Sequence, residues 1–285
     1  MTAPTNAAPG PRAEDVHRAR RRLSTVLVEG LEPLGLAVAE QLTTLGLGTL
    51  LLRDETPVGS SDVPAEPIGP GRRRHAARYR ETDQGRPRLN AALRMLAPAR
   101  PDADTTLVLD APEGAPVLGA DLCVLTGTRA SSAEYLSSTV NDGLPVLPVS
   151  VSAGWLRIGP LLGNTLEWTV HPAAAPDDEQ VAAKGCCPEC LQHHGVVVAH
   201  RESASAAVSA QLIALTASAV AHQVQILIDG ACAPAVESGV LLTDAYSGTS
   251  QLMNLSAHPE CSCLLTRRTP AESPGRRRAW KSSSP

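Results

Sequence analysis

The chain has 285 residues and a formal net charge of −4, and 43% of its residues are hydrophobic against 19% that are charged. This composition is typical of a globular protein and excludes a disordered chain. The acidic balance excludes a dedicated polybasic nucleic-acid binder, and the 2% of aromatic residues offer little surface for stacking bases.

The beginning of the chain shows no targeting or membrane segment. Residues 1–22 are rich in Pro, Ala and Arg and lack the apolar core of a signal peptide. They are predicted to form a disordered and charged N-terminal tail, with residues 1–12 disordered and residues 14–22 compatible with a short charged helix. The most apolar stretch, residues 26–52, is interrupted by Glu29, Glu32 and Glu40, so it is not expected to span a membrane. We therefore expect a cytoplasmic protein whose cysteines are thiols or metal ligands rather than disulfides.

The next segment has the strand–helix–strand pattern of a mononucleotide-binding unit. Residues 25–28 form an apolar strand, residues 34–45 place apolar side chains at helical spacing, and residues 49–52 form a second strand. A loop rich in Pro, Gly and Arg follows at residues 56–82, and a second helix is expected at residues 85–96.

Further apolar runs alternate with a helix: strands at residues 106–110, 120–125 and 145–151, and a helix at residues 131–141. This alternation predicts an α/β fold with a doubly wound, mainly parallel, Rossmann-like sheet. Residues 163–200 are read as irregular. A long amphipathic helix is expected at residues 205–228, followed by a closing hairpin from residues 236–243 and 250–255.

The domain organisation follows from these elements. We expect a single α/β domain at residues 23–265, between the tail at residues 1–22 and a disordered tail at residues 266–285. The long helix has more apolar surface than one covering contact needs, which is compatible with contact to a second chain.

Two closely spaced cysteine pairs give the most specific signal. Cys187-Pro-Glu-Cys190 is a CxxC, and Cys261-Ser-Cys263 is a CxC about seventy residues later. Thiolate pairs from distant segments are what a tetrahedral zinc site needs, so we predict a structural zinc with four sulfur ligands. Cys186 adjoins Cys187 and leaves the register of the first pair open.

A redox pair, or cysteines that share no site, are the alternatives. A thioredoxin-like CxxC begins a helix directly after the first strand of its fold, whereas this one lies in an expected irregular loop far downstream. Three histidines, His193, His194 and His258, are spare ligands in the same segments.

The first strand–helix turn, Gly30-Leu-Glu-Pro-Leu-Gly35, has glycines at both ends, as phosphate-binding turns do. Glu32 would place a negative charge beside a polyphosphate, and Pro33 lacks an N–H that could bind one. Asp54, at the end of the second strand, stands where an acidic residue binds a ribose hydroxyl, with a turn or capping role as the alternative. The candidate nucleotide-binding residues are therefore Gly30, Gly35 and Asp54. The turn is stronger evidence for the fold than for a bound nucleotide.

The order of these segments resembles the ThiF-type superfamily, the bacterial relatives of ubiquitin-activating enzymes. The segments look like its actinobacterial branch, which includes leader-peptide-binding partners of azole-forming peptide cyclodehydratases. The resemblance covers about residues 23–265 and is carried most specifically by Leu144-Pro-Val-Leu-Pro-Val149, Gly159-Pro-Leu-Leu162, Cys187-Pro-Glu-Cys190 and His258-Pro-Glu-Cys-Ser-Cys263.

Active members of that family adenylate the C-terminal carboxylate of a small protein or peptide, using ATP and magnesium. The resemblance therefore implies an ATP pocket at the three candidate nucleotide-binding residues and zinc bound by the four paired cysteines. It also implies a peptide or small-protein partner and a homodimer, with no membrane or nucleic-acid partner.

The sequence departs from the family pattern at the catalytic positions. Glu32 and Pro33 replace glycines, no Asn–Arg–Gln motif is recognisable in Ser60-Ser-Asp-Val63, and Arg88 stands in place of a lysine. The segment Thr126-Gly-Thr-Arg129 lacks the aspartate that would hold magnesium. We therefore predict a degenerate member, non-catalytic or weakly active, that binds a peptide or protein partner.

Three alternatives come from other functional classes. One is an active ATP-dependent adenylyltransferase in which the loop at Arg72–Arg74 replaces the lost arginine. Another is a nicotinamide-dependent oxidoreductase, which the broken glycine turn argues against. The last is a zinc-module nucleic-acid binder, which the acidic balance argues against.

Overall fold

The computed structural model of the chain describes residues 13–64, 77–97, 106–109, 119–141, 143–152, 154–163, 187–196, 208–237 and 239–255. These residues build a mixed sheet with the strand order β3-β2-β1-β4-β5-β6-β7-β8. The parallel part comprises β1 (Thr25–Glu29), β2 (Thr49–Arg53), β3 (Thr106–Leu109), β4 (Leu122–Thr126) and β5 (Val146–Ser152). The antiparallel part adds β6 (Trp155–Ile158), β7 (Gly239–Asp244) and β8 (Ser250–Asn254).

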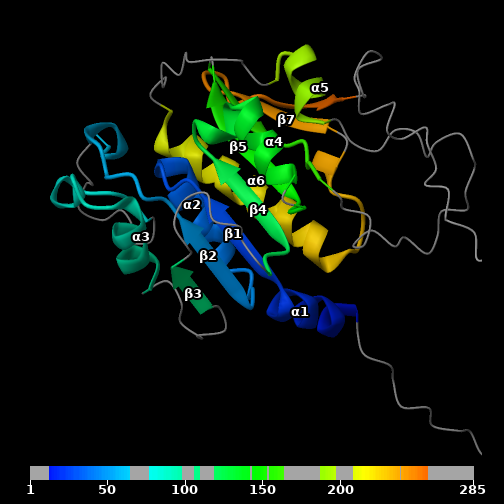
Figure 1. Cartoon of the computed structure of the whole chain (residues 1–285), viewed down its shortest axis with the longest axis horizontal. Helices are drawn as coiled ribbons and strands as arrows, with labels where there is room; N and C mark the ends of the chain where they lie inside the picture. The colour runs from blue at the N-terminus through cyan, green and yellow to red at the C-terminus, as the bar shows by residue number, and fades with distance from the viewer. Residues whose placement is uncertain are drawn as a thin grey trace, which may run out of the picture.

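Helices cover both faces of this sheet (Figure 1), as expected for a doubly wound fold. One face packs against α2 (Pro33–Thr43), α3 (Arg88–Leu96) and α6 (Ala210–Asp229). The other face packs against α4 (Ala133–Asn141) and α5 (Pro188–His193). The α/β architecture with a parallel core is confirmed.

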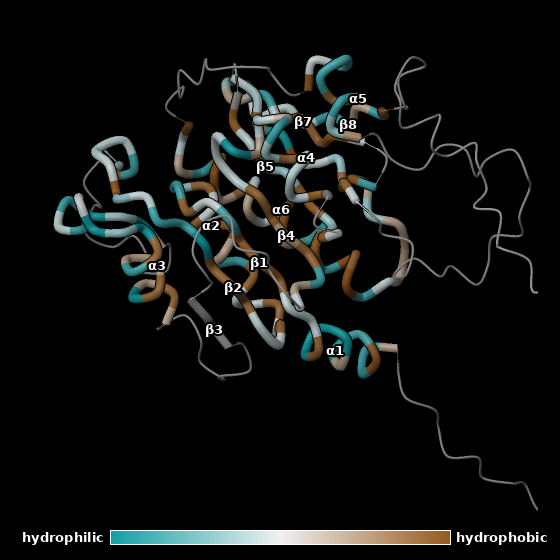
Figure 2. Tube along the Cα trace, viewed as in Figure 1, coloured by the Kyte–Doolittle hydropathy of each residue, from teal (hydrophilic) through white to brown (hydrophobic). Residues whose placement is uncertain are grey.

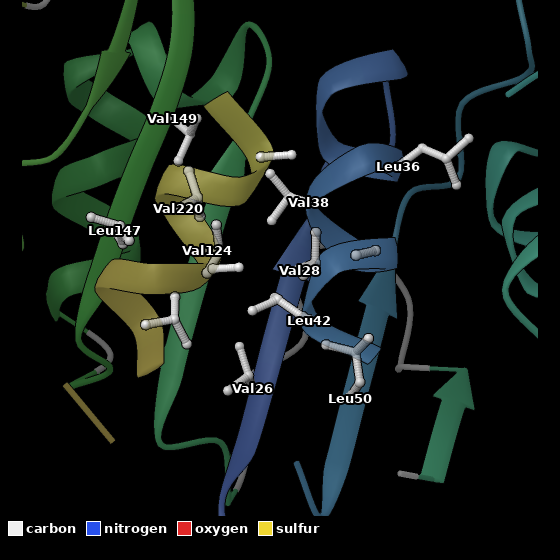
Figure 3. Close-up of a cluster of buried hydrophobic side chains, with 14 of the residues drawn as sticks. Val26, Val28, Leu36, Val38, Leu42, Leu50, Val124, Leu147, Val149 and Val220 are labelled. Atoms are coloured by element: carbon white, nitrogen blue, oxygen red, sulfur yellow. The ribbon is translucent and has the colours of Figure 1, made fainter. Parts of the chain in front are cut away.

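The core is built from aliphatic side chains, since the sequence contains no Phe. Figure 3 shows β-strand residues such as Val28 and Val124 pointing toward Val38 and Leu42 of α2 and Val220 of α6. The central strands are accordingly the most hydrophobic part of the chain in Figure 2. Burial of these side chains, at about 25 cal/mol per Å² of apolar surface, is the main force that holds α2 and α6 to the sheet.

Local signals set the start of α2 and both ends of α6. α2 starts with Pro33 at its first position. Proline is favoured there because the N–H that it lacks would have no hydrogen-bond partner within the helix. α6 starts after Ser209, whose hydroxyl accepts the N–H of Leu212, and ends at Gly230 in the left-handed conformation, with φ of 64°. By length and composition α6 is long and apolar enough to cross a membrane, but half of its most apolar window is buried within the molecule.

The helix α1 (Ala13–Leu23) confirms the short charged helix expected at residues 14–22. Its last turn is anchored to the end of α6. Arg21 binds both carboxylate oxygens of Asp229 at 2.7 and 2.9 Å, and Arg20 donates to the Asp229 carbonyl. These contacts order a helix that has no buried residue of its own.

Two short elements differ from the sequence-based expectation. The strand β6 was not predicted, and α5 lies within the stretch read as irregular. The hairpin of β7 and β8 is confirmed, with its first strand three residues later than expected. The predicted terminal tails at residues 1–12 and 266–285 lie outside the described residues.

Candidate functional site

The sheet has a switch point between β1 and β4. From β1 the chain proceeds to β2 on one side, and from β4 it proceeds to β5 on the other side. In open α/β sheets such a point leaves a crevice at the carboxyl ends of the strands, where ligands bind. Here that position lies between the turn after Glu29 and the turn after Thr126, and these turns with their surrounding residues are called the crevice below.

The first turn packs tightly against β4. Gly30 has φ of +90°, and the Thr126 hydroxyl donates to its carbonyl at 2.6 Å. A Cβ on Gly35 would lie 2.0 Å from the Gly30 carbonyl oxygen and 2.4 Å from the Thr126 hydroxyl. Both predicted glycines are therefore needed by the packing of the turn itself, whether or not a phosphate binds there.

Asp54, the candidate ribose-binding residue, holds this turn in place. Its Oδ2 accepts the N–H of Leu31 at 2.7 Å, and its Oδ1 accepts both the N–H of Thr56, at 2.9 Å, and the Thr56 hydroxyl. Only 2% of Asp54 is exposed. A ribose hydroxyl would have to compete with these donors for the carboxylate.

The guanidinium of Arg88 is committed to acids of the chain. It binds Asp62 through Nε at 2.9 Å and Nη2 at 3.0 Å, while Nη1 donates to the Thr56 hydroxyl at 2.8 Å and approaches Asp54 at 3.4 Å. Burial lowers the pKa of Arg88, but its acidic neighbours outweigh burial and raise that pKa above the ordinary value. Little of this cation's hydrogen-bonding capacity remains for a phosphate.

Glu32 belongs to the first turn, and its carboxylate lies against the second turn at Gly127. A Cβ on Gly127 would lie 2.8 Å from its carboxyl carbon, and the carboxylate accepts a hydrogen bond from the backbone of Thr128. Burial raises the pKa of Glu32 above its ordinary value. Glu32 immediately precedes the first residue of α2. It therefore lies at the helix N-terminus, which is where a bound anion would be attracted.

A second buried carboxylate, Glu29, ends β1. It accepts hydrogen bonds from Arg129 Nη1 at 3.1 Å and from the Tyr135 hydroxyl, and Arg53 Nη1 lies 3.8 Å away. The Arg129 guanidinium also stacks on the Tyr135 ring at 5.4 Å. Where the family resemblance implies a magnesium-binding aspartate, this segment therefore carries an arginine bound to a carboxylate.

Sequence reasoning missed three residues of the crevice: Glu29, Asp62 and Tyr135. A charged residue at the end of an apolar strand was a usable signal for Glu29. The partners of Asp62 and Tyr135 lie 26 and 106 residues away, which no local pattern reveals. The candidate loop at Arg72–Arg74 lies outside the described residues.

The cysteine pair of α5 has the geometry of a metal chelate. Cys187 caps the helix, its Sγ lies 3.6 Å from the Sγ of Cys190, and the N–H of Cys190 points to it at 3.5 Å. Two sulfurs on one tetrahedral zinc lie about 3.8 Å apart, given Zn–S bonds of about 2.3 Å. Within the described residues no group of three or more possible ligands is present. Cys261, Cys263, Cys186 and His258 lie outside them.

The helix α5 changes one argument about this pair. The CxxC does begin a helix, contrary to the expected irregular loop. The argument against a redox pair therefore rests on position alone, since α5 follows β6 and not the first strand.

The fold is known from solved structures. E. coli MccB matches with a TM-score of 0.59 and 15% identity over 87% of this chain and 66% of MccB. MccB has also been solved with ATP, and as the microcin C7 biosynthetic enzyme in complex with N-formylated MccA. PaaA matches with a TM-score of 0.53 and 18% identity over 85% of this chain and 67% of PaaA.

No protein-family model matches the chain, and no curated protein matches it. The chain spans about two thirds of the length of MccB and PaaA. At these identities the likeness shows the fold, which is the one that the resemblance to the ThiF-type superfamily implied.

The packing of the first turn predicts a sharp difference between two glycines. Replacing Gly35 by Ala should destabilise the protein by about 3 kcal/mol or more, because the new Cβ overlaps a carbonyl and a hydroxyl. The control is Gly59→Ala, whose Cβ would meet atoms only at 3.6 Å and beyond and should change stability by less than about 1 kcal/mol. Urea unfolding followed by circular dichroism measures both, and equal effects would contradict this packing.

Because the Glu32 carboxylate is buried, replacing Glu32 by the neutral Gln should stabilise the protein in a pH-dependent way. A carboxyl group whose pKa is raised in the folded state stabilises the fold when protonated and loses that contribution as the pH rises through its folded pKa. Glu32→Gln should therefore be more stable than the wild type at pH 7, with the gain disappearing as the pH falls toward 4. Denaturant midpoints across this range test it against the exposed control Glu81→Gln; a Glu32→Gln gain independent of pH would refute it.

Proposed function

We propose that the chain is a degenerate ThiF-type protein, which binds a peptide or small-protein partner without adenylating it at an enzymatic rate. One observation carries the proposal: the polar groups of the crevice are bonded to one another. The N–H of Leu31 is bound by Asp54, and Arg88 is bound by Asp62. A triphosphate would have to break these bonds before it gained any of its own.

The charge of Glu32 adds to this barrier. Two unit charges of the same sign 4 Å apart repel by about 4 kcal/mol at an effective dielectric constant near 20. Arg129, on the facing turn, does not offset the repulsion, since its guanidinium already binds Glu29. The segment from Thr126 to Arg129 also contains no carboxylate for magnesium, which prefers oxygen ligands of this kind.

A peptide partner is supported by the structural neighbours. MccB has been solved with MccA, and the present chain shares the fold of MccB. We extend the binding of a peptide to this chain and not the reaction, because within the described residues Arg88 and Arg129 are bound to acids and the segment from Thr126 to Arg129 holds no carboxylate for magnesium. A homodimer and a cytoplasmic location remain predictions from the sequence; on α6, Leu215 is 54% exposed and available for such a contact.

The alternative function is an active ATP-dependent adenylyltransferase. The position of Asp54 at the carboxyl end of β2, beside the switch point, favours it. In that case Asp54 would exchange Leu31 for a ribose hydroxyl, and a cation from outside the described residues would neutralise the phosphates.

We also propose a structural zinc held by Cys187, Cys190, Cys261 and Cys263. The donor set fits, because the two sulfurs of α5 have the separation of a chelating pair. Four sulfur ligands leave no open position, so the metal supplies cross-linking and no catalysis. Its role is to fasten α5 to the segment that follows β8.

The absence of catalysis is tested by pyrophosphate exchange. The purified protein should not incorporate labelled pyrophosphate into ATP above background with peptides that end in a free carboxylate. Glu32→Gln should raise ATP affinity by about one to three orders of magnitude, since it removes a repulsion of up to about 4 kcal/mol, yet leave exchange at background. Glu81→Gln is the matched charge control. Exchange by the wild type at about 1 s⁻¹ or faster, a rate ordinary for enzymes, would establish the alternative function.

The zinc proposal predicts about one zinc per chain by elemental analysis. Replacing Cys190 by Ser should remove the metal and destabilise the fold by several kcal/mol, given apparent zinc-binding energies of about 10–16 kcal/mol in small peptides. Cys232→Ser is the control, because Cys232 is exposed in the turn after α6. Protein that contains no zinc after purification from zinc-supplemented medium would refute the metal site.

A further inference from the structure

The described part of the sheet ends at β8, which pairs with β7 alone. Four of the five β8 residues are exposed, and Leu252, in the middle of the strand, is 47% exposed. An edge strand presents a row of backbone N–H and C=O groups that another extended chain can bind. The groups of β8 that face away from β7 are therefore candidates for pairing with a partner.

The register of the hairpin shows which backbone groups these are. The N–H of Asp244 donates to the carbonyl of Thr249 at 2.9 Å, so these residues form a hydrogen-bonded pair at the start of the ladder. Hydrogen-bonded and non-hydrogen-bonded pairs alternate along antiparallel strands. Leu252 faces Leu241 three pairs further on, which makes theirs a non-hydrogen-bonded pair. The N–H and C=O of Leu252 therefore point outward from the sheet, at the centre of β8.

β8 lacks the sequence features that usually protect an edge strand from pairing. Such strands commonly carry Lys, Pro, an inward-pointing charge or a bulge. The sequence of β8 is Ser-Gln-Leu-Met-Asn, which contains no charge and no proline. Its five residues pair one to one with β7, so the strand has no bulge. The edge is therefore regular and uncharged, as an edge that accepts a further strand must be.

We propose that β8 is the docking edge for the peptide partner, which binds as an added strand. The inference rests on the peptide-binding function proposed above and gives that binding a place outside the crevice, at the other end of the strand order from β1. Outward backbone groups select an extended polypeptide, because only another strand offers N–H and C=O groups at the matching spacing.

The side chains of β8 determine which peptide fits. Leu252 shares a sheet face with its partner Leu241, which packs against the buried cluster that includes α6. Two residues away on the same face, the hydroxyls of Thr243 and Ser250 lie 2.9 Å apart. Side chains of paired strands contact one another when they share a face. The favoured peptide is therefore uncharged, with an apolar residue beside Leu252 and a small polar residue two positions along.

The probe is a peptide selected from a displayed library of random dodecapeptides on the wild-type protein. Leu252→Pro removes an outward N–H and leaves the bonds to β7 in place, as proline does at a sheet edge. Its affinity for the selected peptide should be about 10-fold below that of Leu252→Ala, which removes the side chain alone. Circular dichroism verifies that both variants fold.

N-methylated peptides test the same bonds with the wild-type protein, whether or not Leu252→Pro folds. Methylating the amides of alternate peptide residues should abolish binding for one alternating set and spare it for the other, because only every second residue faces β8. Binding unaffected by Leu252→Pro and by both methylated sets would overturn the docking edge and leave the peptide-binding function standing. Loss of a dimer in Leu252→Pro with unchanged peptide binding would assign the edge to a second copy of the chain, and the proposal would be wrong. A library that yields no binding peptide would overturn the peptide-binding function itself.

Discussion

The buried carboxylate of Asp54 is the constraint on which the central crevice depends. A carboxyl group with 2% exposure needs hydrogen-bond partners on both oxygens, and the chain supplies them from Leu31, Thr56 and Arg88. These bonds fix the turn after β1 against the end of β2. They also occupy the backbone N–H of Leu31 and the Asp54 carboxylate, which would be free to bind a nucleotide in an open turn of this kind.

The same arrangement repeats around the switch point. Each cation there faces an acid of the chain: Arg88 faces Asp62, and Arg129 faces Glu29. Such pairs are hydrogen-bonded and partly desolvated, so separating one partner to bind a phosphate costs several kcal/mol. Among the described residues the switch point therefore has the position of a ligand site, while its arginines are already bound to acids of the protein.

The fold was largely predictable from the sequence because its parallel strands are short apolar runs alternating with helical spacing. What escaped prediction was β6, a four-residue strand that contains Arg157, and α5, a six-residue helix that starts with a proline. Arg157 interrupts the apolar run of β6, and α5 is shorter than the window of about eleven residues in which helical periodicity is measurable. Of the site, Gly30, Gly35 and Asp54 lie at the switch point, and their role in nucleotide binding stays a prediction; their present partners were not foreseen. Those partners are contacts between distant segments, and a local motif describes only what a turn offers, not what the rest of the chain brings to it.

The central claim is that the crevice is occupied by its own side chains. Calorimetric titration of the wild-type protein with Mg–ATP tests this most directly, because it needs no knowledge of the partner. The account predicts no saturable binding below about 1 mM, which corresponds to a binding free energy weaker than about −4 kcal/mol. Saturable binding in the low micromolar range, lost on replacement of Asp54 by Ala in a protein that remains folded, would contradict it.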